Sequence, residues 1–317
     1  MGIDRLTERQ VIGEFYKRLE QDIGASWVSQ ISNYFTSDQA SEEYAWLGMT
    51  PALREWIGGR DAKGFRESNY TIKNVHYEAT LDILVRDLRR DKSGQALIRI
   101  AEMAQRANAH WAKLLSDLIV DGEATDCYDG QYFFDTDHSE GDSGSQSNDI
   151  NSDISEYPVT QAGSTTAPSV EEMQWSIMYG IQTMCAFVDD RGEPMNENAR
   201  GFLVMVPPTF MQAGLQAVAT PFQVAAGQSA LSELQREFTI KVVPNVRLSD
   251  WTTKFAIFRT DSMVKAMIRQ EETGVDLKVK GYGSEYEFDN DAHQYGIDTW
   301  RSVGYGYWQH ACLVTLT

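Results

Sequence analysis

The stretch SGQALIRIAEMAQRANAHWAKLLSDLIVD (93–121) carries the longest periodic pattern in the chain. Its apolar side chains recur every three or four residues, which places them on one face of an α-helix. They are Leu97, Ile100, Ala101, Ala104, Ala107, Trp111, Leu115 and Leu118. Gly122 follows as a suitable helix stop. At about 1.5 Å per residue this predicted helix spans roughly 40 Å, which is long for a domain of ordinary size.

The segment before this helix has the period of a β-strand. In VHYEATLDILV (75–85), apolar side chains alternate with polar ones, so one face of the strand is predicted to be buried. We expect residues 43–92 to form a long two-stranded ribbon. Because a two-stranded ribbon is marginally stable in water, its apolar face should rest on another part of the structure.

The N-terminal region predicts a helix over residues 5–23. Thr7 and Gln10 have the spacing of a capping box. One apolar stripe follows, formed by Ile12, Phe15, Tyr16, Leu19 and Ile23. This stripe must be covered, and at the end of a chain the covering surface can belong to another copy.

The second half of the chain mixes helices and strands without regular alternation, which predicts an α+β fold. Residues 139–168 are rich in Ser, Gly, Asp and Asn and predict a solvated loop. The elements expected after it are a helix at 169–188, a strand at 202–208, a helix at 209–219, strands near 238–246 and 254–259, a mixed segment to about 285 and a final strand within 302–317.

Composition excludes several classes of function. The 317 residues are 42% hydrophobic and carry a net charge of −18, whereas a protein that neutralises DNA phosphates needs an excess of Lys and Arg. The three cysteines are far apart and form no Cys-x-x-Cys pair, which argues against a zinc site or a disulfide scaffold. We see neither a signal peptide nor a run of about 20 apolar residues, so we expect a chain made in a cytoplasm, with no membrane partner.

The best candidate for chemistry is CYDGQYFFDTDH (127–138), where Asp135, Asp137 and His138 could ligate a metal. The segment does not fit an EF-hand loop, because Glu140 and Gln146 stand where Gly and Glu are required. We therefore expect a turn and a strand here, and we keep a metal-dependent hydrolase using these three residues as the alternative. GDSG (141–144) lies in a polar loop, and no nucleotide-binding glycine motif occurs. We expect no enzyme activity and no cofactor.

Four stretches resemble the major head subunit of Mu-like phages and prophages. They are EYAWLGMTPALREWIGGR (43–60), VHYEATLDILVRDLRRD (75–91), CYDGQYFFDTDH (127–138) and GYGYWQHA (304–311). The resemblance is weaker through 140–285, and Ser139 stands where the family tends to have Pro. It implies a Hong-Kong-97-type capsid fold and a major capsid protein of a virion shell. Another phage structural protein, such as a decoration or tail protein, is a further alternative.

The same resemblance divides the chain into capsid regions. These are an N-terminal arm (1–42), an extended loop (43–92), a peripheral domain with a spine helix and an acidic loop (93–167), an axial domain (168–285) and a C-terminal return to the peripheral domain (286–317). It implies pentamers and hexamers of the chain, separate scaffold, protease and portal proteins, a decoration protein as an option, and only weak contact with packaged DNA. The residues predicted to contact neighbouring subunits are Phe15, Trp46, Trp56, Tyr77 and Leu81.

Overall fold

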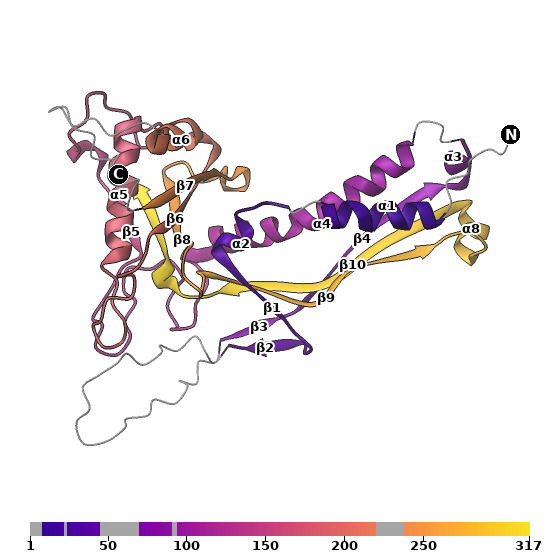
Figure 1. Cartoon of the computed structure of the whole chain (residues 1–317), viewed down its shortest axis with the longest axis horizontal. Helices are drawn as coiled ribbons and strands as arrows, with labels where there is room; N and C mark the ends of the chain where they lie inside the picture. The colour runs from indigo at the N-terminus through magenta and orange to yellow at the C-terminus, as the bar shows by residue number, and fades with distance from the viewer. Residues whose placement is uncertain (1–7, 22–23, 45–69, 91–93, 220–237) are drawn as a thin grey trace, which may run out of the picture.

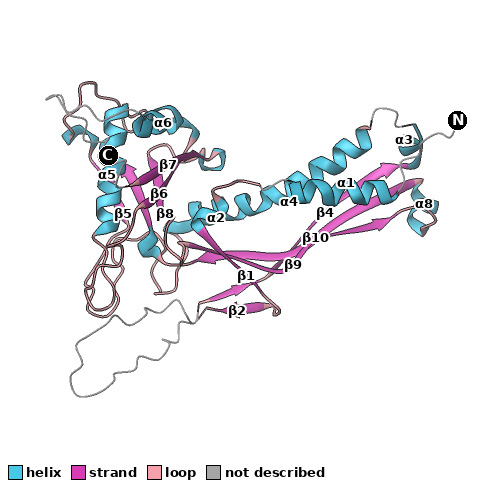
Figure 2. Ribbon diagram, in the orientation of Figure 1, coloured by secondary structure: helices cyan, strands magenta, loops and turns pink. Residues whose placement is uncertain are grey.

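The structure is a computed structural model of the chain that describes residues 8–21, 24–44, 70–90, 94–219 and 238–317. It has an elongated half, in which helices lie along a long twisted sheet, and a second half built on a five-stranded sheet (Figure 1). Helices and strands are mixed in both halves, as Figure 2 shows, and the predicted α+β class is confirmed. None of the helices in the described ranges is both long enough and apolar enough to cross a membrane.

The elongated half is a four-stranded sheet in the order β1-β9-β10-β4. Its strands are β1 (Ser32–Thr36), β9 (Met267–Lys280), β10 (Ala292–Tyr305) and β4 (Val75–Leu84). β1 is parallel to β9, and the other neighbours are antiparallel. The short helix α8 (Glu285–Asn290) lies at the tip of the β9–β10 hairpin. β1 and β4 are the two edge strands of this sheet.

Helix α4 (Gln95–Val120) covers this sheet and confirms the predicted long helix. Its N-terminal half contributes Ile100 and Ala104 to the apolar core of the elongated half. Its C-terminal half contributes Leu115 and Ile119 to the larger core of the second half. One continuous helix therefore joins the two cores, which makes their relative position depend on its stiffness.

Helix α1 (Glu8–Gln21) packs beside α4 and confirms the predicted N-terminal helix. Val11 and Phe15 are fully buried in the same core as Ile100. Asn108 on α4 fixes the end of α1 by donating its side-chain amide to the Leu19 carbonyl oxygen at 2.9 Å. Of the predicted apolar stripe, Phe15, Tyr16 and Leu19 are thus covered by their own chain, and Ile23 lies outside the described residues.

The second half is a five-stranded sheet in the order β5-β11-β8-β6-β7. Its strands are β5 (Asp149–Ser152), β11 (Ala311–Leu316), β8 (Lys254–Arg259), β6 (Gly201–Val206) and β7 (Thr239–Pro244). Helix α5 (Val170–Cys185) packs on this sheet, and α6 (Met211–Ala219) packs on α5 and β7. Gly180 lets α5 approach closely, since a Cβ there would lie 2.5 Å from Cδ1 of Ile257.

Short elements complete the described fold. They are α2 (Val28–Ile31), β2 (Ser41–Glu43), β3 (Thr71–Lys73), α3 (Val85–Arg90) and 3-10 turns at Asp121–Glu123, Ile154–Glu156, Pro208–Phe210, Val246–Leu248 and Trp308–His310. The antiparallel strands β2 and β3 lie on either side of residues 45–69 in the sequence. Beyond their last paired residues, the Tyr44 backbone N–H donates to the Tyr70 carbonyl oxygen at 3.0 Å.

Several predictions of strand partners and boundaries were wrong. The strand at 75–85 exists, but β4 pairs with β10 in the four-stranded sheet instead of forming one side of a ribbon. β9 pairs with β1 and β10 in that sheet, where the sequence had predicted only a mixed segment up to about residue 285. The C-terminal region holds two strands, since a 3-10 turn at Trp308–His310 redirects the chain from β10 into β11 of the other sheet.

The polar segment 139–167 is also more ordered than a solvated loop. It contains β5, which pairs in parallel with β11, and it buries Ile150 and Ile154. Asn148 donates its side-chain amide to the Phe133 carbonyl oxygen at 2.8 Å. Its polar side chains therefore satisfy buried backbone groups, which composition alone does not reveal.

Candidate functional site

The three residues predicted to hold a metal in a hydrolase do not converge in the structure. Asp135 accepts backbone N–H groups of Tyr132 and Thr136 at 3.2 and 2.7 Å, which is turn stabilisation. The exposed Asp137 accepts from the Gln131 side-chain amide at 2.8 Å. His138 is fully buried and turns toward Asp129. The hydrolase built on Asp135, Asp137 and His138 is therefore unsupported.

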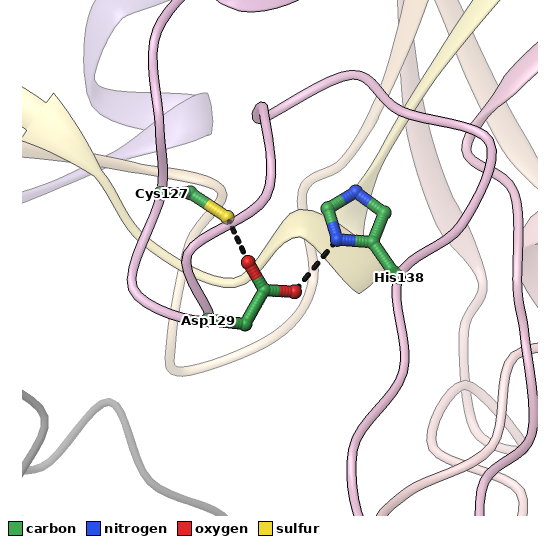
Figure 3. Close-up of side chains that lie close together, drawn as sticks. All are labelled: Cys127, Asp129 and His138. Atoms are coloured by element: carbon green, nitrogen blue, oxygen red, sulfur yellow. Dashed lines mark hydrogen bonds and ion pairs between the residues drawn. The ribbon is translucent and has the colours of Figure 1, made fainter.

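The structure instead brings together Cys127, Asp129 and His138 (Figure 3). Cys127 Sγ donates to one Asp129 carboxylate oxygen at 2.9 Å, and His138 Nδ1 donates to the other at 2.7 Å. Asp129 also accepts the Gln131 backbone N–H at 3.1 Å. The side chain of Asp129 is only 5% exposed, so this carboxylate is buried with three donors around it. No sequence pattern marked Asp129 as the centre of the cluster. The available signal was the Asp129–Gly130 pair, which is typical of a turn.

The carboxylate of Asp129 lies between the Cys127 thiol and the His138 ring, and this arrangement decides which chemistry the cluster can perform. A thiol becomes a nucleophile when an imidazole or another cation stabilises its thiolate, but here the thiol faces the carboxylate. Burial and the charge of Asp129 raise the pKa of Cys127 well above its ordinary value. Burial opposes ionisation of Asp129, yet the hydrogen bonds from His138 and Cys127 keep the pKa of Asp129 below its ordinary value. The arrangement favours a protonated thiol and a charged carboxylate, which is unsuited to covalent catalysis.

The cluster ties the 127–138 turn to the C-terminal segment of the chain. The His138 ring stacks on Trp308 with centroids 4.0 Å apart and planes 8° apart. Beside it, Tyr128 donates to Glu140 at 2.7 Å, and the Gln309 side-chain amide donates to the Tyr128 oxygen at 3.1 Å. The ligand atoms of Cys127, Asp129 and His138 lie within 4.8 Å of one another, so they could also hold a cation. Their mutual hydrogen bonds already satisfy the carboxylate. We therefore interpret the cluster as a structural feature that holds the 127–138 turn against the C-terminal segment.

The second candidate is a groove of about 570 Å³ between α4 and the strands β4, β9 and β10. Tyr77 and Leu81, two of the predicted contact residues, line this groove from β4. Tyr77 packs edge-on against His110 of α4, with ring centroids 4.5 Å apart. Burial and the neighbouring cation Arg301 lower the pKa of His110 to about 4, so this groove residue is neutral at pH 7.

The other predicted contact residues occupy different positions. Phe15 is fully buried against its own chain, and its contact with a neighbour stays a prediction. Trp46 and Trp56 lie outside the described residues, and their contacts stay predictions. Tyr77 and Leu81 are partly exposed in the groove, which leaves their role at a subunit contact a prediction as well.

Comparison with known protein families decides the classification. Residues 9–163 and 232–316 match the family described as Mu-like prophage major head subunit gpT. The chain belongs to this family. The matched residues include nearly all of α1, the whole of α4, the 127–138 cluster, the four-stranded sheet, and the strands β5, β7, β8 and β11 of the five-stranded sheet, so the predicted resemblance is confirmed. The family is one of structural capsid proteins and not of enzymes.

Two curated members show the similarity at the sequence level. The Mu-like prophage FluMu major head subunit of Haemophilus influenzae (strain ATCC 51907 / DSM 11121 / KW20 / Rd) is 37% identical over 116 residues, which are 37% of this chain and 38% of the relative. The major capsid protein of Escherichia phage Mu is 34% identical over 113 residues, which are 36% of this chain and 37% of the relative. These alignments thus span little more than a third of either head subunit.

Solved capsid structures extend the similarity to the whole fold. A chain of the bacteriophage JBD30 procapsid aligns with 98% of this chain, and the alignment covers 76% of that procapsid chain, with a TM-score of 0.54 and 23% identity. A chain of the mature capsid of bacteriophage PhiM1 aligns with 93% of this chain, and the alignment covers 88% of that capsid chain, with a TM-score of 0.54 and 13% identity. At these identities the likeness shows the fold, and the predicted Hong-Kong-97-type capsid fold is confirmed.

Proposed function

We propose that this chain is the major head subunit of a Mu-like tailed phage or prophage, and that its copies assemble as pentamers and hexamers into an icosahedral shell around DNA. The family match over residues 9–163 and 232–316 carries this proposal. The elongated shape supports it, because α4 and the four-stranded sheet expose long flanks that an assembly can cover. Shell closure follows from symmetry and multiplicity, so each individual contact can be modest.

The capsid regions proposed here use boundaries taken from the two sheets. The N-terminal arm covers residues 1–42 and contributes β1 to the four-stranded sheet. The extended loop is the segment that lies between β2 and β3. The peripheral domain consists of α4 and the four-stranded sheet, including β9 and β10. The axial domain consists of the five-stranded sheet with α5 and α6, and β11 completes it.

The proposed partners follow from the charge and from the family. A net charge of −18 suits a capsid shell into which a motor packages the DNA, since a shell protein that condensed DNA directly would be basic. Contact with packaged DNA is then weak and independent of sequence. Scaffold, protease and portal functions reside in separate proteins, and assembly takes place in the cytoplasm of a bacterial host before the chain becomes part of the virion.

Negative-stain microscopy tests this proposal. The chain is expressed alone and together with the genes that neighbour it in its genome. Closed shells or flat sheets of hexamers are the expected result. A monodisperse monomer under both conditions would contradict the proposal.

The extended loop is tested by replacing residues 45–69 with Asn-Gly. Tyr44 and Tyr70 are hydrogen-bonded partners at the end of the β2–β3 pair, so a two-residue turn can connect them without disturbing either strand. We expect a folded chain that no longer forms shells. Normal shells from this variant would contradict the proposal that the loop joins neighbouring subunits.

A further inference from the structure

The outer side of β4 is the longest unpaired strand edge in the described part of the chain. β4 has ten residues, whereas the other edge strands of the two larger sheets, β1, β5 and β7, have five, four and six. Among the described strands, β10 alone pairs with β4. A long edge with free N–H and C=O groups is a template for a strand of another chain.

Other long edges of the same sheet are protected, and β4 is not. β9 extends beyond β1 from residue 272 to residue 280. This part of β9 carries Lys278 and Lys280, and Tyr16 of α1 accepts the Leu277 backbone N–H at 3.3 Å. β4 contains no Pro and no Lys, and its pairing with β10 has no bulge. Natural proteins use these devices to keep an edge strand from pairing, so their absence points to a partner strand.

The hydrogen bonds at the two ends of β4 show which residues face its free edge. Val85, directly after β4, donates its backbone N–H to the Asp291 carbonyl oxygen, directly before β10, at 2.9 Å. Asn74, directly before β4, donates its backbone N–H away from β10, to Ala40 at 2.9 Å. Backbone groups alternate between the two sides of an antiparallel strand. The odd-numbered residues of β4 therefore bond to β10, and the even-numbered residues 76–82 present their N–H and C=O groups to the free edge.

Two copies of β4 can pair in antiparallel fashion about a twofold axis, and one register suits their side chains. A register centred on Ala79 places no two like charges opposite each other; its pairs are Val75–Ile83, His76–Asp82, Tyr77–Leu81 and Glu78–Thr80. A register centred on Thr80 would place Glu78 opposite Asp82, and one centred on Glu78 would place two copies of that acid opposite each other. Like charges directly opposite destabilise a strand pair. The sequence of β4 is thus complementary to itself in the Ala79 register.

The same register covers apolar side chains on the inner face of the strand. Tyr77, Ala79 and Leu81 line the groove under α4 from β4. Tyr77 and Leu81 are half-buried in the single chain, and Ala79 is exposed. In the Ala79 register Tyr77 of each copy lies beside Leu81 of the other, on the side of the sheet that α4 covers. Pairing therefore removes apolar surface from water as well as satisfying the backbone of the edge.

We propose that β4 of one copy pairs with β4 of a second copy, antiparallel and centred on Ala79, so that the two four-stranded sheets form one continuous sheet. The contact is isologous, because the same surface of both copies meets about a twofold axis. This inference rests on the proposed function, since it assigns one twofold contact between head subunits.

A cysteine series in assembled particles tests the register. Ala79 faces its own copy in a pair without mutual backbone hydrogen bonds, where Cα atoms lie about 4.5 Å apart, within the range of about 4.4–6.8 Å that a disulfide spans. Glu78→Cys and Thr80→Cys are the matched controls. In this register each control cysteine lies diagonally from its copy, at about 7–8 Å, which a disulfide does not bridge.

Particles of each variant are assembled with the products of the neighbouring genes, oxidised with glutathione disulfide and analysed on non-reducing gels. We expect a disulfide-linked dimer from Ala79→Cys, and monomers from both controls and from the unaltered chain. Mass spectrometry should identify the linkage between residues 79 of two copies. Shells of Ala79→Cys without this linkage, or dimers of either control, would overturn the proposal and leave the head-subunit function intact. Absence of shells from the unaltered chain would instead contradict the proposed function.

A proline at the free edge provides an independent readout. Thr80→Pro removes a backbone N–H that points away from β10, a position that an edge strand tolerates, so the chain should still fold. Thr80→Val is the matched control, because it removes the same hydroxyl and keeps the N–H. We expect Thr80→Pro to lower the yield of shells about tenfold or more, and Thr80→Val to leave it within about twofold of that of the unaltered chain. Equal yields from the two variants would overturn the proposal.

Discussion

Replacing Asp129 with Ala tests whether the Cys127–Asp129–His138 cluster stabilises the fold. The change removes the acceptor for Cys127 and Gln131 and for the His138 ring. The other ring nitrogen of His138, Nε2, already has no hydrogen-bond partner among the described residues. Each hydrogen bond to a charged group contributes about 1.5–3 kcal/mol, and a stranded buried donor costs about 1–3 kcal/mol. Because the three bonds share one carboxylate, these values do not add. We expect a loss of about 3–5 kcal/mol in the free energy of unfolding, as for a broken buried pair.

Urea unfolding of the unassembled chain, followed by tryptophan fluorescence, measures this loss. Trp308 stacks on the His138 ring and is placed to report on the cluster. With a slope of about 3 kcal/mol per molar urea, a loss of about 4 kcal/mol lowers the midpoint by roughly 1.3 M.

The control is Asp137→Ala, which removes an exposed carboxylate that accepts a hydrogen bond from the Gln131 side chain. It should change the free energy of unfolding by less than about 1 kcal/mol. If Asp129→Ala and Asp137→Ala have the same midpoint, the cluster does not stabilise the fold and our interpretation of it is wrong.

Three further changes test other parts of the structure. Gly306→Ala should destabilise the fold by about 2–3 kcal/mol, because its Cβ would lie 2.3 Å from the Lys265 carbonyl oxygen; thermal melting measures this. Burial lowers the pKa of His310 to about 3, so on acidification His310 takes up a proton in the unfolded chain at a higher pH than in the folded chain. The free energy of unfolding should therefore fall by up to about 4 kcal/mol as the pH drops from about 6.5 to about 3. His310→Gln should flatten this part of the pH profile of the urea midpoint. Ser169→Ala removes the capping box with Glu172 at the start of α5 and should cost about 1 kcal/mol by urea titration.

Local periodicity predicted the elements with strong patterns. The three- and four-residue spacing around Ile100 and Leu115 located α4, and the alternation at 75–85 located β4. β9 was missed although Val275, Leu277 and Val279 alternate with polar residues in its C-terminal part, because this pattern is short and does not continue through the middle of the strand. Its segment Gln270–Glu272 has no apolar face, and its place is set by pairing with β1 and β10. Pairing between distant segments is a property of the tertiary structure that single-strand patterns do not contain.

The functional surfaces were harder to predict than the elements. Asp135 and Asp137 drew attention because they are adjacent to His138 in sequence, whereas the partner of His138 in space is Asp129, nine residues away. The groove combines segments from residues 77 to 301, so no local motif announces it. The resemblance to head subunits, carried by long and unusual stretches, predicted the function better than any search for catalytic residues.

The most direct test of the head-subunit assignment is the mass of the species that the purified chain forms with the products of its neighbouring genes. Sedimentation velocity measures this mass in solution without selecting particles on a grid. We predict megadalton particles in which this chain is the main component. A chain that remains a monomer or dimer at every concentration and in every combination would contradict the assignment.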